Sequence, residues 1–159
     1  MIFCANSTTG IYGILMTEVN FTVFEASWEK HQHEIRFIRT QVFVLEQRVP
    51  EELEWDGLDD TAIHVLAFTS GQIPAGTARL LISGQIGRMA VLKQYRNMGI
   101  GTAILVKLIQ IAASHNINPL FLNAQLHAIR FYEKHGFIPD GGIFDDAGIP
   151  HRKMIHNSL

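Results

Sequence analysis

The chain has 159 residues, of which 47% are hydrophobic and 18% are charged, so its composition is that of one globular domain with its own core. Its formal net charge is −2, and its lysines and arginines form no cluster. Nucleic acids and anionic membranes are normally bound by a basic face, so the sequence predicts neither as a partner.

Residues 1–15 are predicted to be an extension, and residues 16–159 the working domain. The extension mixes apolar residues with Asn, Ser, Thr and Gly and contains no lysine or arginine. A secretory signal would combine a basic start with an unbroken apolar run, and a membrane span would need about 20 apolar residues. The only cysteine is Cys4, and no Cys/His spacing is that of a zinc site. We therefore expect a cytoplasmic protein without a metal.

The first part of the domain is predicted to contain a strand, a long helix and a loop. Apolar residues alternate at positions 20–25, which favours a strand. From residue 28 to about 47, apolar residues recur every three or four positions, as on one face of a helix, and Pro50 ends this pattern. Residues 51–60 follow as an acidic loop rich in turn-forming residues.

The remainder of the domain alternates between predicted strands and helices. The expected strands are residues 62–68, 73–82, 85–91 and 120–124, and a final hairpin of 143–144 with 151–155. The expected helices are residues 100–114 and 127–134, and Gly136 stands where a left-handed cap would end the second one. This order of elements predicts a mixed α/β domain.

The most informative segment leads from the strand at 85–91 through Gly99 and Gly101 into the helix at 100–114. The first amides of a helix lack internal acceptors and carry partial positive charge, so they suit a phosphate, and glycine permits close approach. The segment lacks the pattern of a P-loop, and Ile104 stands where a dinucleotide fingerprint needs a small residue. A purely structural role, as a tight helix entrance, stays open.

Residues 96–101, Arg-Asn-Met-Gly-Ile-Gly, match the signature Arg/Gln-x-x-Gly-x-Gly/Ala of the GNAT superfamily of N-acetyltransferases, which the chain resembles. Residues 128–137 resemble a second family motif, Ala-x-x-x-Tyr-Glu-Lys-x-Gly-Phe, in the expected order. The resemblance covers roughly residues 20–155. It implies a GNAT fold, in which helices flank a mostly antiparallel central sheet and the fourth and fifth strands splay apart.

The resemblance also implies how acetyl-CoA binds as a co-substrate. Backbone amides of residues 96–101 would hold the diphosphate, and the strand edge at 89–91 would bind the pantetheine arm and the acetyl carbonyl. Gln125 stands where the family often has Asn, and its amide can still reach that arm. The expected cofactor-binding residues are Met89, Ala90, Val91, Arg96, Asn97, Met98, Gly99, Ile100, Gly101, Thr102, Asn123, Gln125 and Tyr132.

Direct transfer in a ternary complex needs a base for the ammonium, a donor for the oxyanion and an acid for the leaving thiolate. Tyr132 occupies the family position whose phenol lies near the sulfur of CoA, so it is the expected acid; its alternative is a tyrosine packed on Phe137. The N–H near Val91 is the expected oxyanion donor. The base stays unassigned. Residues that could serve as base or bind the acceptor are Glu46, Glu54, Asp56, His64 and His151.

These observations predict an enzyme that acetylates a primary amine of a small molecule. The acidic residues of 51–60 would attract a cationic amine, although a solvated surface loop explains them equally well. His64 lies in an apolar strand, which favours a core histidine. Two other functions stay open: a non-catalytic module that binds acyl-CoA, and a protein-directed acetyltransferase. Tyr132 favours the enzyme over the first of these, and a homodimer is left open.

Overall fold

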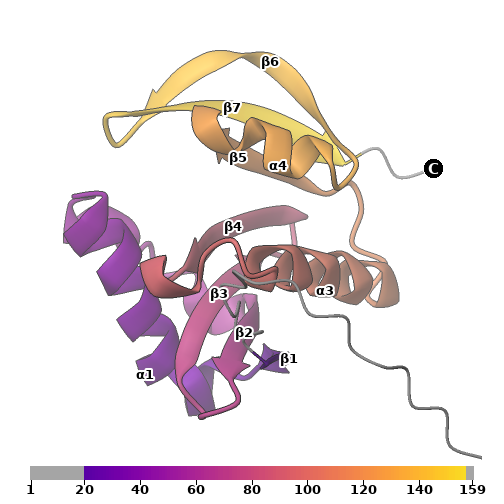
Figure 1. Cartoon of the computed structure of the whole chain (residues 1–159). Helices are drawn as coiled ribbons and strands as arrows, with labels where there is room; N and C mark the ends of the chain where they lie inside the picture. Colours follow the sequence, from indigo (N-terminus) through magenta and orange to yellow (C-terminus); the bar gives the residue numbers. More distant parts are fainter. Residues whose placement is uncertain (1–19, 157–159) are drawn as a thin grey trace, which may run out of the picture.

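The structure is a computed structural model that describes residues 20–156; the predicted extension, with Cys4, lies outside the described residues. A seven-stranded sheet runs through the molecule in the order β1-β2-β3-β4-β5-β7-β6. Neighbouring strands are antiparallel except β4 and β5, which are parallel. This arrangement, with helices on both faces, confirms the predicted mixed α/β fold with a mostly antiparallel sheet (Figure 1).

The elements follow one another with short connections. The strands are β1 (Phe21–Ala26), β2 (Ile63–Thr69), β3 (Pro74–Leu80), β4 (Gln85–Val91), β5 (Phe121–Gln125), β6 (Phe137–Asp146) and β7 (Ile149–His156). The α-helices are α1 (Trp28–Arg39), α2 (Glu51–Glu54), α3 (Ile100–Ser114) and α4 (Ile129–Glu133). The described residues also form a π-helix, η1 (Thr40–Glu46), and three 3-10 turns, η2 (Asp59–Thr61), η3 (Lys93–Tyr95) and η4 (Leu126–Ala128). Within residues 20–156, no helix has the length and apolar content to cross a lipid bilayer.

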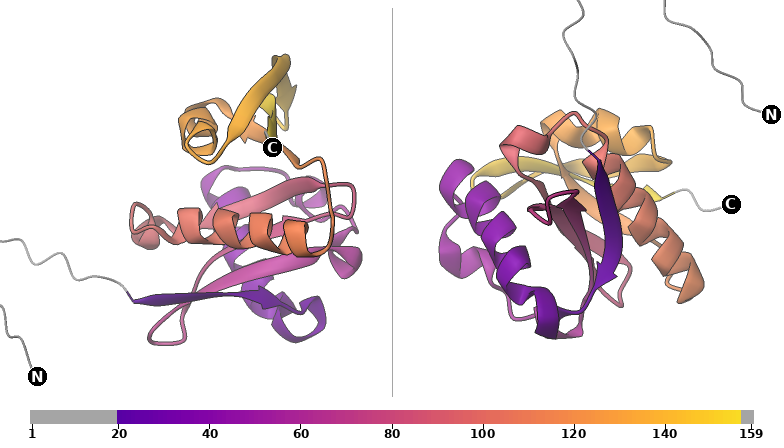
Figure 2. Two further views of the ribbon diagram at one scale, coloured as in Figure 1. Left: turned by 90° about the vertical axis from the view of Figure 1, so that its right-hand side faces the viewer. Right: turned by 60° about the horizontal axis from the view of Figure 1, so that its bottom comes forward.

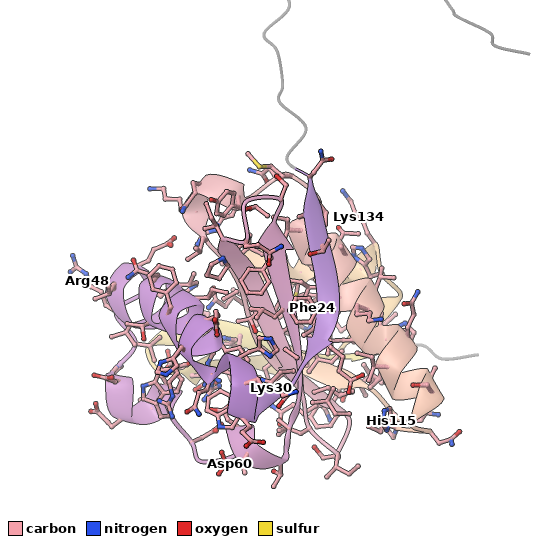
Figure 3. All side chains as sticks on the ribbon, turned by 90° about the horizontal axis from the view of Figure 1, so that it is seen from below. Phe24, Lys30, Arg48, Asp60, His115 and Lys134 are labelled. Carbon is pink, nitrogen blue, oxygen red and sulfur yellow. The ribbon has the colours of Figure 1, made fainter. Side chains whose placement is uncertain are left out.

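Helices α1 and α3 cover opposite faces of strands β1 to β4 (Figures 2 and 3). Each face has its own core, because successive side chains of a strand point to opposite sides. In β4, for example, Met89 and Val91 pack into the core beneath α3, whereas Ala90 belongs to the core beneath α1. Gly76 of β3 allows α3 to lie close to the sheet, since a Cβ there would stand 2.8 Å from the side chain of Ile104.

Strands β4 and β5 pair only where they begin. Gln85 lies opposite Phe121 and Ile86 opposite Leu122, and β4 has no register with β5 beyond these residues. In the same region β4 contains a bulge, because its pairing with β3 skips from Gly87 to Ala90 and Arg88 has a φ of 50°. The predicted splay is therefore present, and β5, β6, β7 and α4 lie together on one side of β4 and α3 (Figure 1).

Several predicted elements differ from the observed ones. The loop expected at 51–60 contains α2 and begins η2. The helix expected at 28–47 is α-helical only to Arg39 and continues as the π-helix η1. The helix expected at 127–134 is split between η4 and α4. The final hairpin begins at Phe137, because β6 pairs with β7 from there on across an irregular stretch between Pro139 and Ile143. The apolar pattern of the sequence is broken in that stretch, so it did not indicate a strand.

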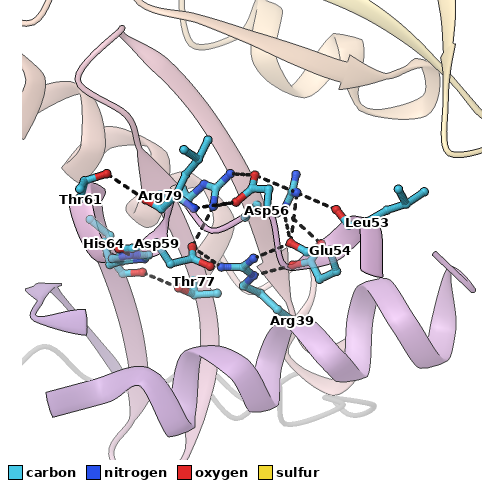
Figure 4. A network of polar contacts seen from close by, with 12 residues as sticks. Arg39, Leu53, Glu54, Asp56, Asp59, Thr61, His64, Thr77 and Arg79 are labelled. Atoms are coloured by element: carbon cyan, nitrogen blue, oxygen red, sulfur yellow. Dashed lines mark hydrogen bonds and ion pairs between the residues drawn. The ribbon is translucent and has the colours of Figure 1, made fainter. Parts of the chain in front are cut away.

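The acidic loop at 51–60 is fixed to the sheet by a buried network of ion pairs (Figure 4). Arg39, which is 1% exposed, binds Glu54 through Nε at 2.5 Å and Asp59 through Nη1 at 2.6 Å. Arg79 binds Asp59 at 2.8 Å, and both of its terminal nitrogens donate hydrogen bonds to the carboxylate of Asp56. This loop is therefore anchored at three carboxylates.

Arg88 of the β4 bulge joins the same network from the other side. Its Nε lies 3.1 Å from a carboxylate oxygen of Glu54, and its Nη2 donates to the carbonyls of Leu53 and Glu54 at 3.1 Å. The bulge thus holds α2 over the strand that carries it. Burial raises the pKa of Glu54, whereas the charges of Arg39 and Arg88 oppose that rise.

We predict that Arg39→Ala lowers the free energy of unfolding by about 3–5 kcal/mol, because it leaves Glu54 and Asp59 buried without their main partner. Urea denaturation followed by circular dichroism measures this loss. Arg130→Ala is the matched control, since Arg130 is exposed and should change the value by less than about 0.5 kcal/mol. Equal losses in both variants would contradict the structural role of the network.

Candidate active site

A cleft of about 860 Å³ lies where β4 and β5 diverge. Residues of η1 and α2 form one wall, β4 forms the floor, and β5, η4 and Tyr132 of α4 form the opposite wall. Asp146, the last residue of β6, and Ala147, in the turn that follows, also line the cleft. The volume of the cleft falls in the range of sites that hold small molecules and cofactors, which is roughly 300–1,000 Å³.

The edge of β4 faces this cleft without a partner strand. Met89, Ala90 and Val91 all line it, so backbone groups that point away from β3 are available to an extended ligand. The carbonyl of Val91 is an exception, because it accepts a hydrogen bond of 2.9 Å from Nε of Arg96. Asn123 and Gln125 of β5 line the cleft across from this edge.

The start of α3 has the properties of an anion site. Gly99 is the N-cap with a φ of 84°, and no side chain caps the helix. The carbonyl of Gly99 accepts the amide of Ala103 at 3.0 Å, so the amides of Ile100, Gly101 and Thr102 have no acceptor within the helix. Of the other residues predicted here, Asn97 and Met98 are exposed in the loop, whereas the side chain of Ile100 is buried in the core and leaves only its backbone for a ligand.

Tyr132 projects from α4 into the cleft. Its hydroxyl lies 3.7 Å from the sulfur of Met89, and its ring packs edge-on against Phe131 and Phe137. Burial raises the pKa of Tyr132 to about 12, so the phenol keeps its proton at neutral pH. A protonated phenol beside the edge of β4 is placed to donate a proton to a ligand that runs along that edge.

Two of the predicted carboxylates line the cleft, but both are bound by arginines. Glu46 forms a two-point ion pair with Arg96, at 2.6 and 2.7 Å, and the hydrogen bond from Arg96 lowers the pKa of Glu46. Glu54 is 2% exposed and lies between Arg39 and Arg88. Both carboxylates are therefore engaged by arginines, and Glu54 is also withdrawn from solvent.

Asp56 and His64 do not line the cleft. Asp56 is held by Arg79 and Arg88, and the hydrogen bond from Arg79 lowers its pKa. His64 is 1% exposed and stacks on Trp28, and its Nε2 donates to the carbonyl of Asp59 at 2.8 Å. Burial lowers the pKa of His64. The structure therefore places these two side chains in the anchoring network of the acidic loop.

His151 lies on β7 and lines the cleft, opposite Gln125 in the sheet. Its Nδ1 is 2.8 Å from the carbonyl oxygen of Ile149. Because a carbonyl only accepts, Nδ1 carries the proton and the neutral ring keeps the lone pair on Nε2. Among the residues predicted as base candidates, His151 alone combines a place in the cleft with a basic atom outside an ion pair.

Sequence reasoning did not identify Gln47, Arg88 or Asp146, although all three line the cleft. The Oε1 of Gln47 accepts a hydrogen bond of 2.9 Å from the amide of Gln125, so the two walls are joined. Gln47 lies at the end of the helix predicted at 28–47, where its residue type alone indicates no function. No signal in the sequence could have paired Gln47 with a residue 78 positions away. Within residues 20–156 no set of three His, Cys, Asp or Glu side chains is grouped as a metal would require.

Comparisons with known proteins agree with this geometry. Residues 25–157 match the family model of the acetyltransferase (GNAT) domain. The uncharacterized N-acetyltransferase YjcF of Bacillus subtilis is 38% identical over 123 residues, which cover 75% of this chain and 87% of that protein. Protein ElaA of Escherichia coli is 32% identical over 130 residues, which cover 77% of this chain and 84% of ElaA.

Solved structures show the same fold. The crystal structure of Escherichia coli ElaA has a TM-score of 0.76 at 26% identity and covers 87% of this chain and 100% of ElaA. An acyl-CoA N-acyltransferase from Pseudomonas aeruginosa has a TM-score of 0.75 at 29% identity, with 87% of this chain and 99% of that one covered. Together with the family match over residues 25–157, they show that the chain belongs to the GNAT family of acetyltransferases and is an acyltransferase that uses acetyl-CoA.

Proposed function

We propose that this enzyme moves the acetyl group of acetyl-CoA directly to a primary amine of a small molecule, within a ternary complex. The observation that carries the proposal is the content of the cleft. A protonated phenol, Tyr132, and an imidazole with a free lone pair, His151, face the same space beside the unpaired edge of β4. These are the acid and the base that transfer to an amine requires.

The cofactor would enter along the β4 edge. Its diphosphate suits the free amides of Ile100, Gly101 and Thr102, because those amides and the helix end attract an anion. Its pantetheine arm would follow Met89 to Val91, with Asn123 and Gln125 on the other side. A structure from Bacillus anthracis in complex with acetyl coenzyme A shares this fold, with a TM-score of 0.52 at 22% identity over 60% of this chain.

The chemistry then needs no covalent intermediate on the enzyme. Nε2 of His151 takes a proton from the ammonium of the acceptor, directly or through one water, and the neutral nitrogen attacks the carbonyl carbon of the thioester. A backbone N–H of the β4 edge stabilises the oxyanion. The carbon–sulfur bond breaks as the hydroxyl of Tyr132 protonates the departing thiolate of CoA. The amide nitrogen gives up its second proton, which returns to the Tyr132 phenolate directly or through water, and the proton held by His151 leaves to solvent. The products are an amide and free CoA.

Two features favour a small acceptor over a protein. The wall made by α2 is fixed by the buried ion pairs of Arg39 and Arg88, and the β6–β7 turn stands at the opposite rim. An open groove, which a polypeptide would need, is therefore narrowed on both sides. The joint presence of Tyr132 and His151 also favours an enzyme over a module that only binds acyl-CoA.

We predict different effects of alanine at the two glycines of α3. Gly99→Ala places a Cβ at a φ of 84° and should cost about 1–2 kcal/mol of stability and weaken acetyl-CoA binding. Gly101→Ala should leave stability and acetyl-CoA binding unchanged, because its Cβ would lie at an ordinary contact distance of 3.6 Å from the side chain of Met89. Calorimetry with acetyl-CoA and thermal unfolding measure these effects. Full affinity in Gly99→Ala would argue against a diphosphate at this helix start.

The central test measures thiol release from acetyl-CoA over a panel of amines. We expect release by the wild type to depend on the amine, and Tyr132→Phe to lower kcat about tenfold or more while acetyl-CoA affinity stays the same. The pKa of Tyr132 is about 12, so the phenol stays protonated throughout the usual assay range and should cause no loss of activity at mildly alkaline pH. Binding of acetyl-CoA without release on any amine would contradict the transfer function.

We predict that His151→Gln lowers kcat by roughly 10²–10⁴ at neutral pH, because an amide cannot take the proton of the ammonium. The loss should shrink as the pH approaches the pKa of the amine, about 10, where the acceptor is neutral without help. His135→Gln is the matched control, since His135 also donates from Nδ1 to a carbonyl, at 2.7 Å, but does not line the cleft. A loss that is constant with pH would exclude His151 as the base.

A further inference from the structure

Two of the three carboxylates that line the cleft form ion pairs with arginines that also line it, and the third does not. Glu46 is matched by Arg96 at 2.6 and 2.7 Å, and Glu54 by Arg88 at 3.1 Å. Asp146 also lines the cleft, at the end of β6, and it forms no ion pair with any residue between 20 and 156. The cleft therefore has one exposed carboxylate that lacks a cation.

Asp146 differs in this respect from its neighbour in the turn. Oδ1 of Asp145 accepts the amide of Gly148 at 2.9 Å, so that carboxylate stabilises the turn itself, and Asp145 does not line the cleft. Asp146 makes no comparable bond within the described part of the chain. One of two adjacent aspartates thus builds the hairpin, and the other faces the cleft.

Apolar side chains lie beside Asp146 and on the wall made by η1 and α2. Ile149, its partner in the β6–β7 pairing, lines the cleft beside it, and Phe43, Val49 and Leu53 line the wall made by η1 and α2. An apolar chain with a positive end suits such a surface, because the chain contacts the hydrocarbon side chains while the charge reaches the carboxylate.

The acidic loop at 51–60 is a poor alternative for this role. Its carboxylates at Glu54, Asp56 and Asp59 are taken up by Arg39, Arg79 and Arg88 (Figure 4), and Glu51 and Glu52 do not line the cleft. The attraction for a cation therefore lies on the opposite side, at the β6–β7 hairpin.

We propose that Asp146 binds a second positive charge of the acceptor, so that the enzyme prefers an amine substrate that is at least dicationic. The inference rests on the proposed function. The reacting nitrogen must be neutral, and a carboxylate next to it would hold its proton on. A second ammonium keeps its proton and gains from the carboxylate. His151, the proposed base, and Asp146 belong to the same hairpin, in which Phe144 pairs with His151 and Asp146 with Ile149. The two side chains therefore lie on the same face of the hairpin.

Kinetics with matched acceptors test this inference. Each α,ω-diaminoalkane of a series is compared with the monoamine of the same chain length. We expect the wild type to prefer the diamine, and Asp146→Asn to raise KM for the diamine roughly three- to tenfold while KM for the monoamine and both kcat values stay unchanged. Asp145→Asn is the matched control, since it removes the same charge one residue away and still leaves an oxygen for the amide of Gly148.

Calorimetry separates a failure of this inference from a failure of the proposed function. The complex of the enzyme with CoA is titrated with a quaternary bis-ammonium alkane, which cannot be acetylated, and with its mono-ammonium analogue. Tighter binding of the dication that disappears in Asp146→Asn supports the inference even if no amine releases thiol. Equal binding of both cations, or an equal loss in Asp145→Asn, would overturn it whether or not transfer occurs.

Discussion

Parallel pairing between β4 and β5 ends after Ile86 and Leu122, where the bulge at Arg88 bends β4. In a continuous sheet the next residues of β4 would be covered by a neighbouring strand. Here the backbone of Met89 to Val91 faces a cleft instead, and a polar backbone that is withdrawn from water needs another partner. An extended ligand with amide groups can replace the missing strand.

The same bulge also connects the sheet to the wall of the cleft. A positive φ at Arg88 belongs to a backbone that departs from the regular strand, and the Arg88 side chain binds α2 through Glu54 and two carbonyls. Arg39 and Arg79 hold the rest of the loop through Glu54, Asp56 and Asp59. Buried ion pairs of this kind add little net stability compared with apolar packing, but they specify one position of the loop. The carboxylates of Glu54, Asp56 and Asp59 therefore stabilise the position of the loop and are not free to bind a ligand.

The two sides of the cleft therefore differ in their chemical groups. The η1 and α2 side offers apolar side chains and carboxylates already matched by arginines. The opposite side carries Tyr132, with its raised pKa, and the β6–β7 hairpin carries His151 and Asp146. The hydrogen bond between Gln47 and Gln125 links the two sides without adding charge. The proton transfers that we propose therefore belong to α4 and the hairpin.

The sequence by itself determined the fold class, the start of α3 and the family, because these depend on local features. Periodicity places α3 at residues 100–114, and the conformation that Gly99 adopts is one that glycine favours over other residues. Only the tertiary structure decided the extent of β6 and which of the candidate residues line the cleft. β6 forms through pairing with β7. The carboxylate of Glu46 is bound by Arg96, which lies 50 positions away in the sequence. Local sequence patterns do not show such long-range pairings. Only the folded chain shows that four of the five base candidates are bound by other residues of the protein, whereas His151 lines the cleft outside any ion pair.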